Sequence, residues 1–152
     1  MIIKLRNRLL AAIMAFVSII YIVIVEDIDS DIHVVSNYSM VQQVVEILMD
    51  NAIKYTNDDG EIRITASAEK SGAVVQIQNT GTGISPADID KIFDRFYRGD
   101  KARVYKEGNY GLGLSIAKSI VQKLGGEISA KSNSESTVFT VRIPNNKKSH
   151  YS

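Results

Sequence analysis

Three glycines, Gly108, Gly111 and Gly113, open a stretch whose apolar residues recur at helical spacing until Gly125-Gly126 ends it. A glycine-rich entry to a helix lets backbone N–H groups approach a ligand, and the positive end of the helix dipole favours an anion such as phosphate. A glycine-rich turn that only caps a core helix fits the same pattern. The apolar positions are Leu112, Leu114, Ile116, Ala117, Ile120, Val121 and Leu124.

The two best-known phosphate motifs do not match this stretch. A P-loop requires Lys-Ser or Lys-Thr directly after its last glycine, whereas Lys118-Ser119 lies inside the expected helix. A dinucleotide fingerprint requires a strand directly before the glycines, but the preceding RGDKARVYKEGNY is charged and irregular. A phosphate site here therefore needs another architecture.

Composition limits the possible chemistry. The chain has 152 residues, enough for one domain with a core, and its net charge of +1 gives no argument for a nucleic-acid partner. It has no cysteine, which excludes disulfides, cysteine-bound zinc and thiol nucleophiles.

The N-terminal segment has two interpretations. A basic start is followed by an uncharged run from Leu9 to Val25, which is typical of a short membrane anchor at the lower limit of spanning length. The β-branched Ile19–Val25 instead predicts a buried strand that ends in a turn at EDIDSD. Residues 1–29 are accordingly expected to be a separate apolar segment, with membrane contact through residues 1–25 as one alternative.

The remaining pattern predicts two helices, two hairpins and one further short helix. A strand at 32–35 precedes a helix over 39–55, whose N-cap is Ser36 or Asn37. Its expected apolar face consists of Val41, Val44, Val45, Leu48, Ala52 and Tyr55. Asn57–Gly60 is interpreted as a hairpin turn before two antiparallel strands, and Ser85-Pro86 begins a short helix.

The helix over 112–124 and a last hairpin complete the order of elements. This order predicts an α+β fold, a two-layer sandwich in which a mixed, mostly antiparallel sheet carries its helices on one face. We expect this domain to occupy residues 30–145, followed by a polar tail at 146–152.

Four segments in this order resemble a known family. They are EILMDNAIKYT (46–56), QNTGTGI (78–84), FDRFYRGD (93–100) and GNYGLGLSIAK (108–118). They resemble the N, G1, F and G2 boxes of the ATP-binding domain of sensor histidine kinases, in the superfamily shared with gyrase, Hsp90 and MutL. The resemblance covers roughly residues 30–144 and implies a Bergerat-type fold that binds ATP and Mg²⁺. The third segment favours the histidine kinase branch.

The resemblance assigns roles to the polar residues of the helix over 39–55. Asn51 would be the magnesium ligand, because an amide oxygen is a hard, neutral donor that suits a cation bridging phosphates. Lys54, three residues on, would supply positive charge to the phosphates, while Asp50 and Tyr55 line the nucleotide rim. Glu46 is a candidate for orienting the attacking group. Without the resemblance, these are ordinary solvated helix residues, with Tyr55 in the core.

The G1-like turn departs from the family at Asn79, where the usual residue is an Asp that accepts from the adenine amino group. Asn79 can accept through its amide oxygen, but it carries no charge and its amide can flip. Gly81 and Gly83 would let the backbone approach the base, and Ile84 would pack beneath it. A plain glycine-rich turn between a strand and a helix is the alternative.

The F-like box is expected to anchor its helix in the core through Phe93 and Phe96, with Phe96 also near the nucleotide. Tyr97 and Arg98 begin a segment that resembles the family's lid over ATP. Three basic residues are candidates for the γ-phosphate, or else form a solvated basic stretch: Arg98, Lys101 and Arg103.

The G2-like turn also departs from the family, which usually has small residues where this chain has Asn109 and Tyr110. The bulky Tyr110 would either crowd the phosphates or lie outward. The residues expected to bind phosphate, by backbone amides or packing, are Gly108, Tyr110, Gly111, Leu112, Gly113 and Leu114.

A phospho-accepting histidine in the family's sequence context is absent, because the chain has only His33 and His150. The first Asn of the usual N box is also replaced, by Ile47. The leading hypothesis is an ATP-binding catalytic domain that transfers phosphate to a histidine on dimerisation helices, supplied in trans or by a longer parent chain. A response regulator would be its further partner, and the cytoplasmic face of a bacterial cell its location. The alternatives are an anti-sigma-factor-like serine kinase or binding module, and a degenerate nucleotide-binding fragment.

Overall fold

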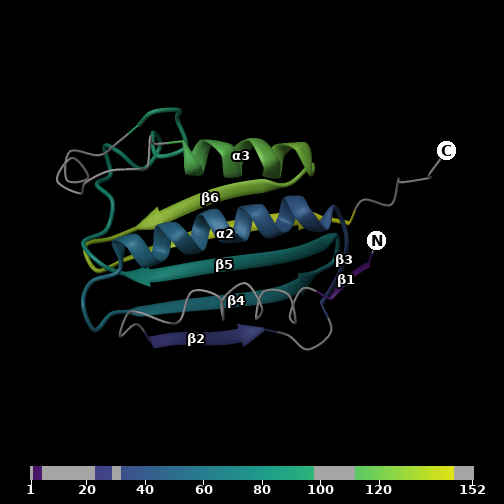
Figure 1. Ribbon diagram of the computed structural model, residues 1–152, viewed down its shortest axis with the longest axis horizontal. Helices are drawn as coiled ribbons and strands as arrows, with labels where there is room; N and C mark the ends of the chain where they lie inside the picture. Colours follow the sequence, from purple (N-terminus) through teal and green to yellow (C-terminus); the bar gives the residue numbers. More distant parts are fainter. Residues whose placement is uncertain (1, 5–22, 29–31, 98–111, 146–152) are drawn as a thin grey trace.

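The computed structural model of the chain describes residues 2–4, 23–28, 32–97 and 112–145. Within these residues a five-stranded sheet has the order β2-β4-β5-β7-β6 (Figure 1). The strands are β2 (Val23–Ile28), β4 (Glu61–Glu69), β5 (Gly72–Thr80), β6 (Glu127–Ser132) and β7 (Ser136–Pro144). β2 runs parallel to β4, and all other neighbouring strands are antiparallel.

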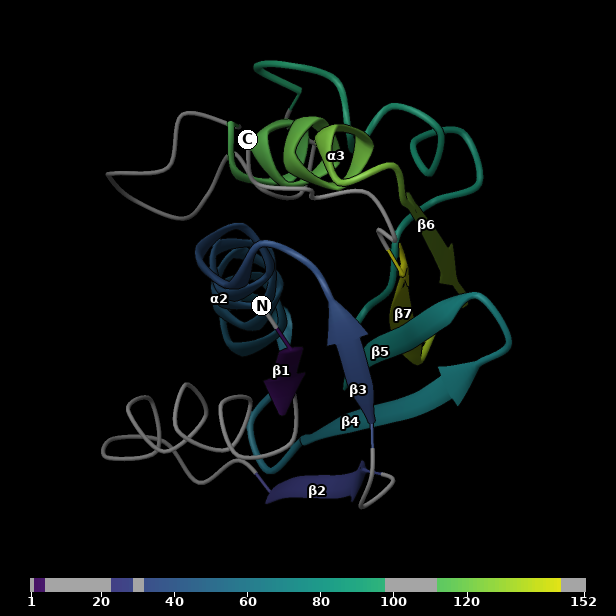
Figure 2. The same cartoon turned by 90° about the vertical axis from the view of Figure 1, so that its right-hand side faces the viewer.

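Two helices, α2 (Tyr38–Tyr55) and α3 (Gly113–Lys123), cover one face of this sheet (Figure 2). A second, small sheet joins β1 (Ile2–Lys4) antiparallel to β3 (His33–Val35), next to α2. The predicted α+β architecture, with a mixed and mostly antiparallel sheet, is therefore confirmed.

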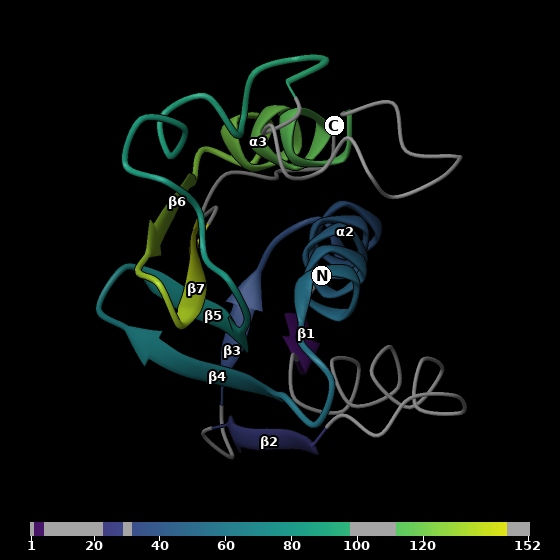
Figure 3. The same ribbon diagram turned by 90° about the vertical axis from the view of Figure 1, so that its left-hand side faces the viewer.

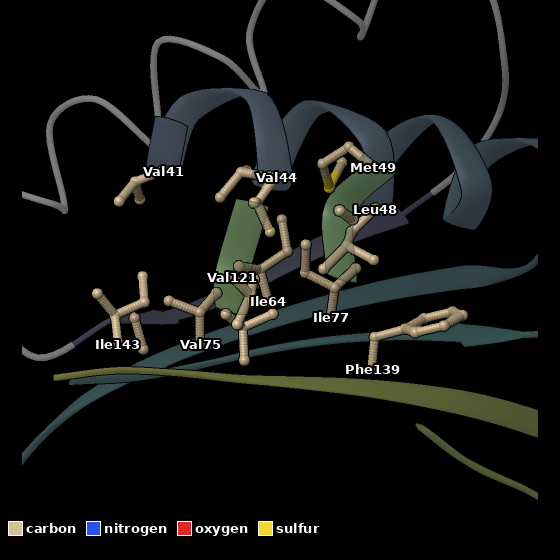
Figure 4. Close-up of a cluster of buried hydrophobic side chains, with 14 of the residues drawn as sticks. Val41, Val44, Leu48, Met49, Ile64, Val75, Ile77, Val121, Phe139 and Ile143 are labelled. Atoms are coloured by element: carbon tan, nitrogen blue, oxygen red, sulfur yellow. The ribbon is translucent and has the colours of Figure 1, made fainter. Parts of the chain in front are cut away.

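The core lies between the helices and the sheet, as Figure 4 shows for α2 above β5 and β7. Alternate residues of β4, β5 and β7 point toward the helices, as the period of two along a strand requires. The predicted apolar face of α2 is buried except at its end, where Tyr55 is 43% exposed. The buried residues of α2 are Val41, Val44, Val45, Leu48, Met49 and Ala52.

Both ends of α2 are set by local hydrogen bonds. Asn37 is the N-cap, as predicted, and its Oδ1 accepts from the Met40 backbone nitrogen at 3.2 Å. At the other end the Thr56 backbone nitrogen donates to the Ala52 carbonyl at 2.9 Å. The predicted hairpin at Asn57–Gly60 is wrong, because this turn joins α2 to β4, and a helix and a strand form no hairpin.

The predicted helix after Ser85 is also wrong. Residues 86–96 form successive hydrogen-bonded turns rather than a continuous α-helix, and Phe96 has a φ of 64°. A positive φ in a residue other than glycine is incompatible with a right-handed helix. In Figure 3 this segment leaves the end of β5, passes beside β6 and reaches the level of α3.

The N-terminal part of the chain contributes to both sheets. β2 joins residues 23–28 to the main sheet, so the strand continues through Glu26 and Asp27, where a turn was expected. The greater part of the predicted apolar segment, residues 5–22, lies outside the described residues. Within the described part of the chain, no helix combines the length and apolarity needed to span a membrane.

Candidate nucleotide-binding site

The turn after β5 lies against the C-terminal end of α2. A Cβ atom on Gly81 would overlap the carbonyl oxygen of Tyr55, so only glycine fits there. The neighbouring Thr80 Oγ1 donates to Asn57 Oδ1 at 2.9 Å and accepts from the Glu61 backbone nitrogen at 2.9 Å. These contacts bring together the first two of the four segments identified in the sequence.

The other side of this turn lies against the connection between β6 and β7. Gly83 has a φ of 68°, and a Cβ there would overlap the carbonyl oxygen of Asn133. The next residue, Ile84, donates its backbone N–H to Ser132 Oγ at 2.8 Å. Both predicted glycines are therefore required by the local geometry, whatever ligand the turn binds.

Asn79 is buried at the end of β5, with only 3% of its surface exposed. Its Nδ2 donates to the Thr80 carbonyl at 3.1 Å. A flipped amide would place oxygen against oxygen at this contact, so the hydrogen bond fixes the orientation. The amide oxygen is left as an acceptor, which the role predicted for this residue would require.

The polar residues predicted on α2 lie along one face near its C-terminus. Asn51 is half-buried, Lys54 is exposed, and the Lys54 Nζ lies 5.2 Å from the centre of the Tyr55 ring. At spacings of three and four residues, Lys54 and Tyr55 neighbour Asn51 on this face. Tyr55 is thus exposed, beside Gly81, and not in the core.

Two carboxylates lie one turn apart on α2. Glu46 Oε1 accepts from Gln42 Nε2 at 2.8 Å. Partial burial raises the pKa of the Asp50 carboxyl, and the negative charge of Glu46 raises that pKa further. A cation near this face of α2 would relieve the repulsion between the two carboxylates.

The N-terminus of α3 approaches α2 at Gly113. A Cβ on Gly113 would lie 3.4 Å from Ile47 Cγ2, so the residue that replaces the usual Asn packs beneath the start of α3. Leu112 occupies the N-cap position and offers no side-chain hydrogen bond to the first turn. Leu114 is partly buried against the core. Six of the predicted site residues lie outside the described residues: Arg98, Lys101, Arg103, Gly108, Tyr110 and Gly111.

The two phenylalanines of the F-like box have different environments. Phe93 packs edge to face on the buried Phe139, with ring centres 6.3 Å apart, and Lys118 Nζ lies 5.8 Å from its ring centre. Phe96 is 70% exposed, so the prediction that it anchors the core is wrong.

Sequence reasoning missed two polar residues beside Asn79. Thr137 lies directly opposite Asn79 in the β5–β7 pairing and is 5% exposed. Ser132 lies opposite Thr137 on β6, and their hydroxyl oxygens are 2.7 Å apart. Nothing in the local sequence distinguishes them from other strand hydroxyls, because their importance depends on the register of three strands.

Comparison with known proteins identifies the family. Residues 36–147 match the model of the histidine kinase-, DNA gyrase B- and HSP90-like ATPases. The chain belongs to this family. The match includes all four sequence segments, and it confirms the ATPase superfamily that the segments resemble.

Relatives place this family member in the histidine kinase branch. The chain is 46% identical over 111 residues to the sensor protein CiaH of Streptococcus pneumoniae, covering 72% of this chain and 25% of CiaH. It is 39% identical over 119 residues to the sensor histidine kinase WalK of Bacillus subtilis, covering 76% of this chain and 20% of WalK. The chain thus spans about a quarter or less of these relatives.

Solved structures agree with the fold. The catalytic domain of histidine kinase ThkA superposes with a TM-score of 0.84 at 26% identity, covering 95% of each chain. The domain therefore has the fold of a histidine kinase catalytic domain, as the sequence predicted.

Proposed function

We propose that this ATPase-family domain binds Mg-ATP between the C-terminal half of α2, the turn after β5 and the start of α3. The observation that carries the proposal is the close packing of Gly81 on the Tyr55 carbonyl. This contact holds the turn after β5 against the end of α2. The buried amide oxygen of Asn79 and the polar face of α2 around Asn51 can therefore line the same binding site. A base and a triphosphate can then be bound together.

The proposed roles follow the chemistry of each residue. Asn79 accepts a hydrogen bond from the adenine amino group, while Gly81, Gly83 and Ile84 form the surface beneath the base. Lys54 and the first-turn N–H groups at Leu112–Leu114 neutralise the phosphates, since an uncapped helix start favours anions. The additional contacts proposed from the sequence are Tyr55, Phe96, Arg98, Gly108, Tyr110 and Gly111.

Magnesium fits this site only as a cation shared with the nucleotide. Among the described residues, no group of three or more His, Cys, Asp or Glu could hold a metal ion. Asn51 would supply one amide oxygen, and phosphates and water the other ligands, which suits the reluctance of Mg²⁺ to lose its waters. Bound there, the ion would neutralise charge on the phosphates.

The proposed reaction moves the γ-phosphoryl group of ATP to a histidine of a separate helical hairpin. The bond between the γ-phosphorus and its bridging oxygen breaks, a phosphorus–nitrogen bond forms on the histidine, and ADP leaves. Such transfer depends on positioning and charge neutralisation more than on covalent chemistry by the protein. Glu46 is the candidate for orienting the attacking nitrogen. His33 lies in β3, paired with β1, and lacks the sequence context of a phospho-accepting histidine.

The proposed partners and location follow from the relatives. A structure of ThkA in complex with the response regulator TrrA contains a kinase with this fold, at a TM-score of 0.82 and 24% identity. We propose a response regulator as the downstream partner and the cytoplasmic side of a bacterial cell as the location. Membrane contact through residues 1–25 remains part of this proposal.

Labelled ATP tests the proposed reaction directly. The chain is incubated with γ-labelled ATP and a separate histidine-bearing helical hairpin taken from CiaH, with a hairpin lacking the histidine as control. We expect acid-labile label on the intact hairpin alone. Nucleotide binding with no label on either hairpin would favour the alternative, a domain that binds nucleotide without phosphotransfer.

A further inference from the structure

The hydroxyl of Thr80 connects the turn after β5 to the segment that follows α2. Thr80 is the last residue of β5, and its Oγ1 donates to Asn57 Oδ1 at 2.9 Å. The same oxygen accepts from the backbone nitrogen of Glu61, the first residue of β4, at 2.9 Å. Asn57 directly follows Thr56, the C-cap of α2. One side chain therefore joins the ends of three elements.

Gly60 leaves room for the hydrogen bond between Asn57 and Thr80. A Cβ on Gly60 would lie 2.6 Å from Asn57 Oδ1 and 2.6 Å from Thr80 Oγ1, the two bonded oxygens themselves. The Gly60 backbone nitrogen also donates to the Asn57 carbonyl at 3.0 Å, which closes the turn that presents Asn57. The connection between α2 and β4 thus has a conformation that this hydrogen bond requires.

The orientation of the Asn57 amide follows from the needs of the Thr80 hydroxyl. Because Thr80 Oγ1 already accepts from Glu61, its hydrogen needs an acceptor, and within the described residues Asn57 Oδ1 supplies it. A flipped amide would present its NH₂ group and leave that hydrogen without an acceptor. Removing the Asn57 side chain therefore breaks the link to the end of α2 and spares the link to β4.

The Thr80–Asn57 bond is the second of two adjacent links between the turn and α2. The first is the close packing of Gly81 on the Tyr55 carbonyl. Close packing sets how near the turn lies to the helix, whereas a directional hydrogen bond also fixes its orientation. Together the two links set the spacing between the turn and Asn51, which lies one helical turn before Tyr55.

We propose that Asn57 is a positioning residue for the nucleotide site. Acting through Thr80, it holds the turn after β5 at the spacing from Asn51 that allows one nucleotide to reach both. A site whose two halves are already spaced for the ligand loses less freedom on binding. Asn57 lies outside all four sequence segments. This inference rests on the proposed binding of Mg-ATP.

The test measures the affinity for ATP with Mg²⁺ and with a chelator, by calorimetric titration, and compares their ratio among variants. We expect the wild-type chain to bind more tightly with Mg²⁺. In Asn57→Ala the phosphates of a bound nucleotide are no longer held in line with Asn51, so the ratio falls by about threefold or more. Affinity in chelator should stay near that of wild type, because Asn51 then has no ion to bind.

Changes at Thr80 provide a matched pair of variants. Thr80→Ser retains the hydroxyl and is expected to keep the wild-type ratio, whereas Thr80→Val removes the hydroxyl and lowers the ratio. The double variant Asn57→Ala/Thr80→Val should have the same ratio as Thr80→Val alone, since each change breaks the same bond. Asp58→Ala changes an exposed residue of the same turn and is expected to leave the ratio unchanged.

The outcomes separate this inference from the proposed function. A folded Asn57→Ala that weakens ATP equally with Mg²⁺ and with chelator has a purely structural defect and overturns the inference. A wild-type ratio in Asn57→Ala overturns it as well, as does a wild-type chain that binds ATP without any gain from Mg²⁺. A wild-type chain that binds no ATP under either condition contradicts the proposed function itself.

Discussion

Gly81 and Tyr55 are in such close contact that the turn after β5 and the C-terminal end of α2 form one structural unit. The Gly81 amide nitrogen also donates to the Glu135 carbonyl at 2.9 Å, on the opposite side of the turn. The turn is therefore fixed between α2 and the β6–β7 connection. Any side chain at Gly81 would push these two elements apart.

Gly81→Ala is expected to lower the free energy of unfolding by about 1–3 kcal/mol, because its Cβ would overlap backbone that cannot move aside. Affinity for Mg-ATP is expected to fall as well. Chemical denaturation and calorimetry measure the two effects. Gly113→Ala is the matched control, since its Cβ would meet only the Ile47 side chain at 3.4 Å and its stability change should stay below about 1 kcal/mol. Equal losses of unfolding free energy in Gly81→Ala and Gly113→Ala would contradict this explanation.

Phe93→Ala is expected to cost about 2–4 kcal/mol of stability, because the ring packs on Phe139 and interacts with Lys118. Phe96→Ala removes an exposed ring and is expected to change stability by less than about 0.5 kcal/mol. Phe96→Gly, at a positive φ, is expected to be neutral or stabilising. Urea denaturation of the three variants checks this order, and a large loss in Phe96→Ala would refute it.

The contrast between these phenylalanines indicates where sequence reasoning succeeds. The helices α2 and α3 and both hairpins were predictable because their apolar periods match what the core buries. The segment after Ser85 was not, because its apolar residues also fit a helix, whereas its backbone forms a series of separate turns. The order of the motifs singled out Asn51, Asn79 and the glycines as candidate site residues.

The position of Ser132 and Thr137 beside Asn79 could not be predicted, because it depends on strand register, which no local sequence pattern encodes. The turn at Asn57–Gly60 was misread for a related reason. Its residues are typical of a hairpin, but the element before it is a helix, and turn chemistry alone does not identify the elements it connects.

We expect the stability of the segment after Ser85 to depend on pH through the ionisation of Asp88. Hydrogen bonds from the Tyr97 hydroxyl and from Ser85 Oγ, at 2.8 Å in the latter case, hold the pKa of Asp88 below its ordinary value of 3.8. The ionised form is thus favoured in the folded state. The stabilisation of the folded state by the Asp88 carboxylate is complete above about pH 4 and is lost as the pH falls through the lowered pKa.

Thermal melts of the wild-type chain and of Asp88→Asn test this dependence. Asp88→Asn is expected to melt at a lower temperature than wild type at pH 7, and the two curves should converge below the folded pKa. Ser67→Ala, at an exposed position of β4, is the control and should leave the pH profile unchanged. A constant difference between Asp88→Asn and wild type at all pH values would show that these hydrogen bonds do not depend on the charge.

The ionisation of Asp50 is expected to have the opposite effect on stability. Its pKa is raised, first by burial and then by Glu46, so ionisation destabilises the folded state, and this cost disappears as the pH falls through the raised pKa. Asp50→Asn should therefore melt slightly higher than wild type at pH 7 and equally below the ordinary value of 3.8. Carboxyl NMR titration should show the Asp50 pKa falling in Glu46→Gln but not in Glu61→Gln. No response to Glu46→Gln would remove the electrostatic explanation.

The most direct test of the central claim is a calorimetric titration of ATP into the wild-type chain and Asn51→Ala, each with Mg²⁺ and with a chelator. If Asn51 binds the nucleotide-bound ion, the wild-type chain binds ATP more tightly with Mg²⁺. Asn51→Ala should lose most of that gain, a loss of about tenfold or more, and match wild type in chelator. Equal affinity of the two proteins for Mg-ATP would contradict the assignment of Asn51, and no binding by either would contradict the nucleotide site.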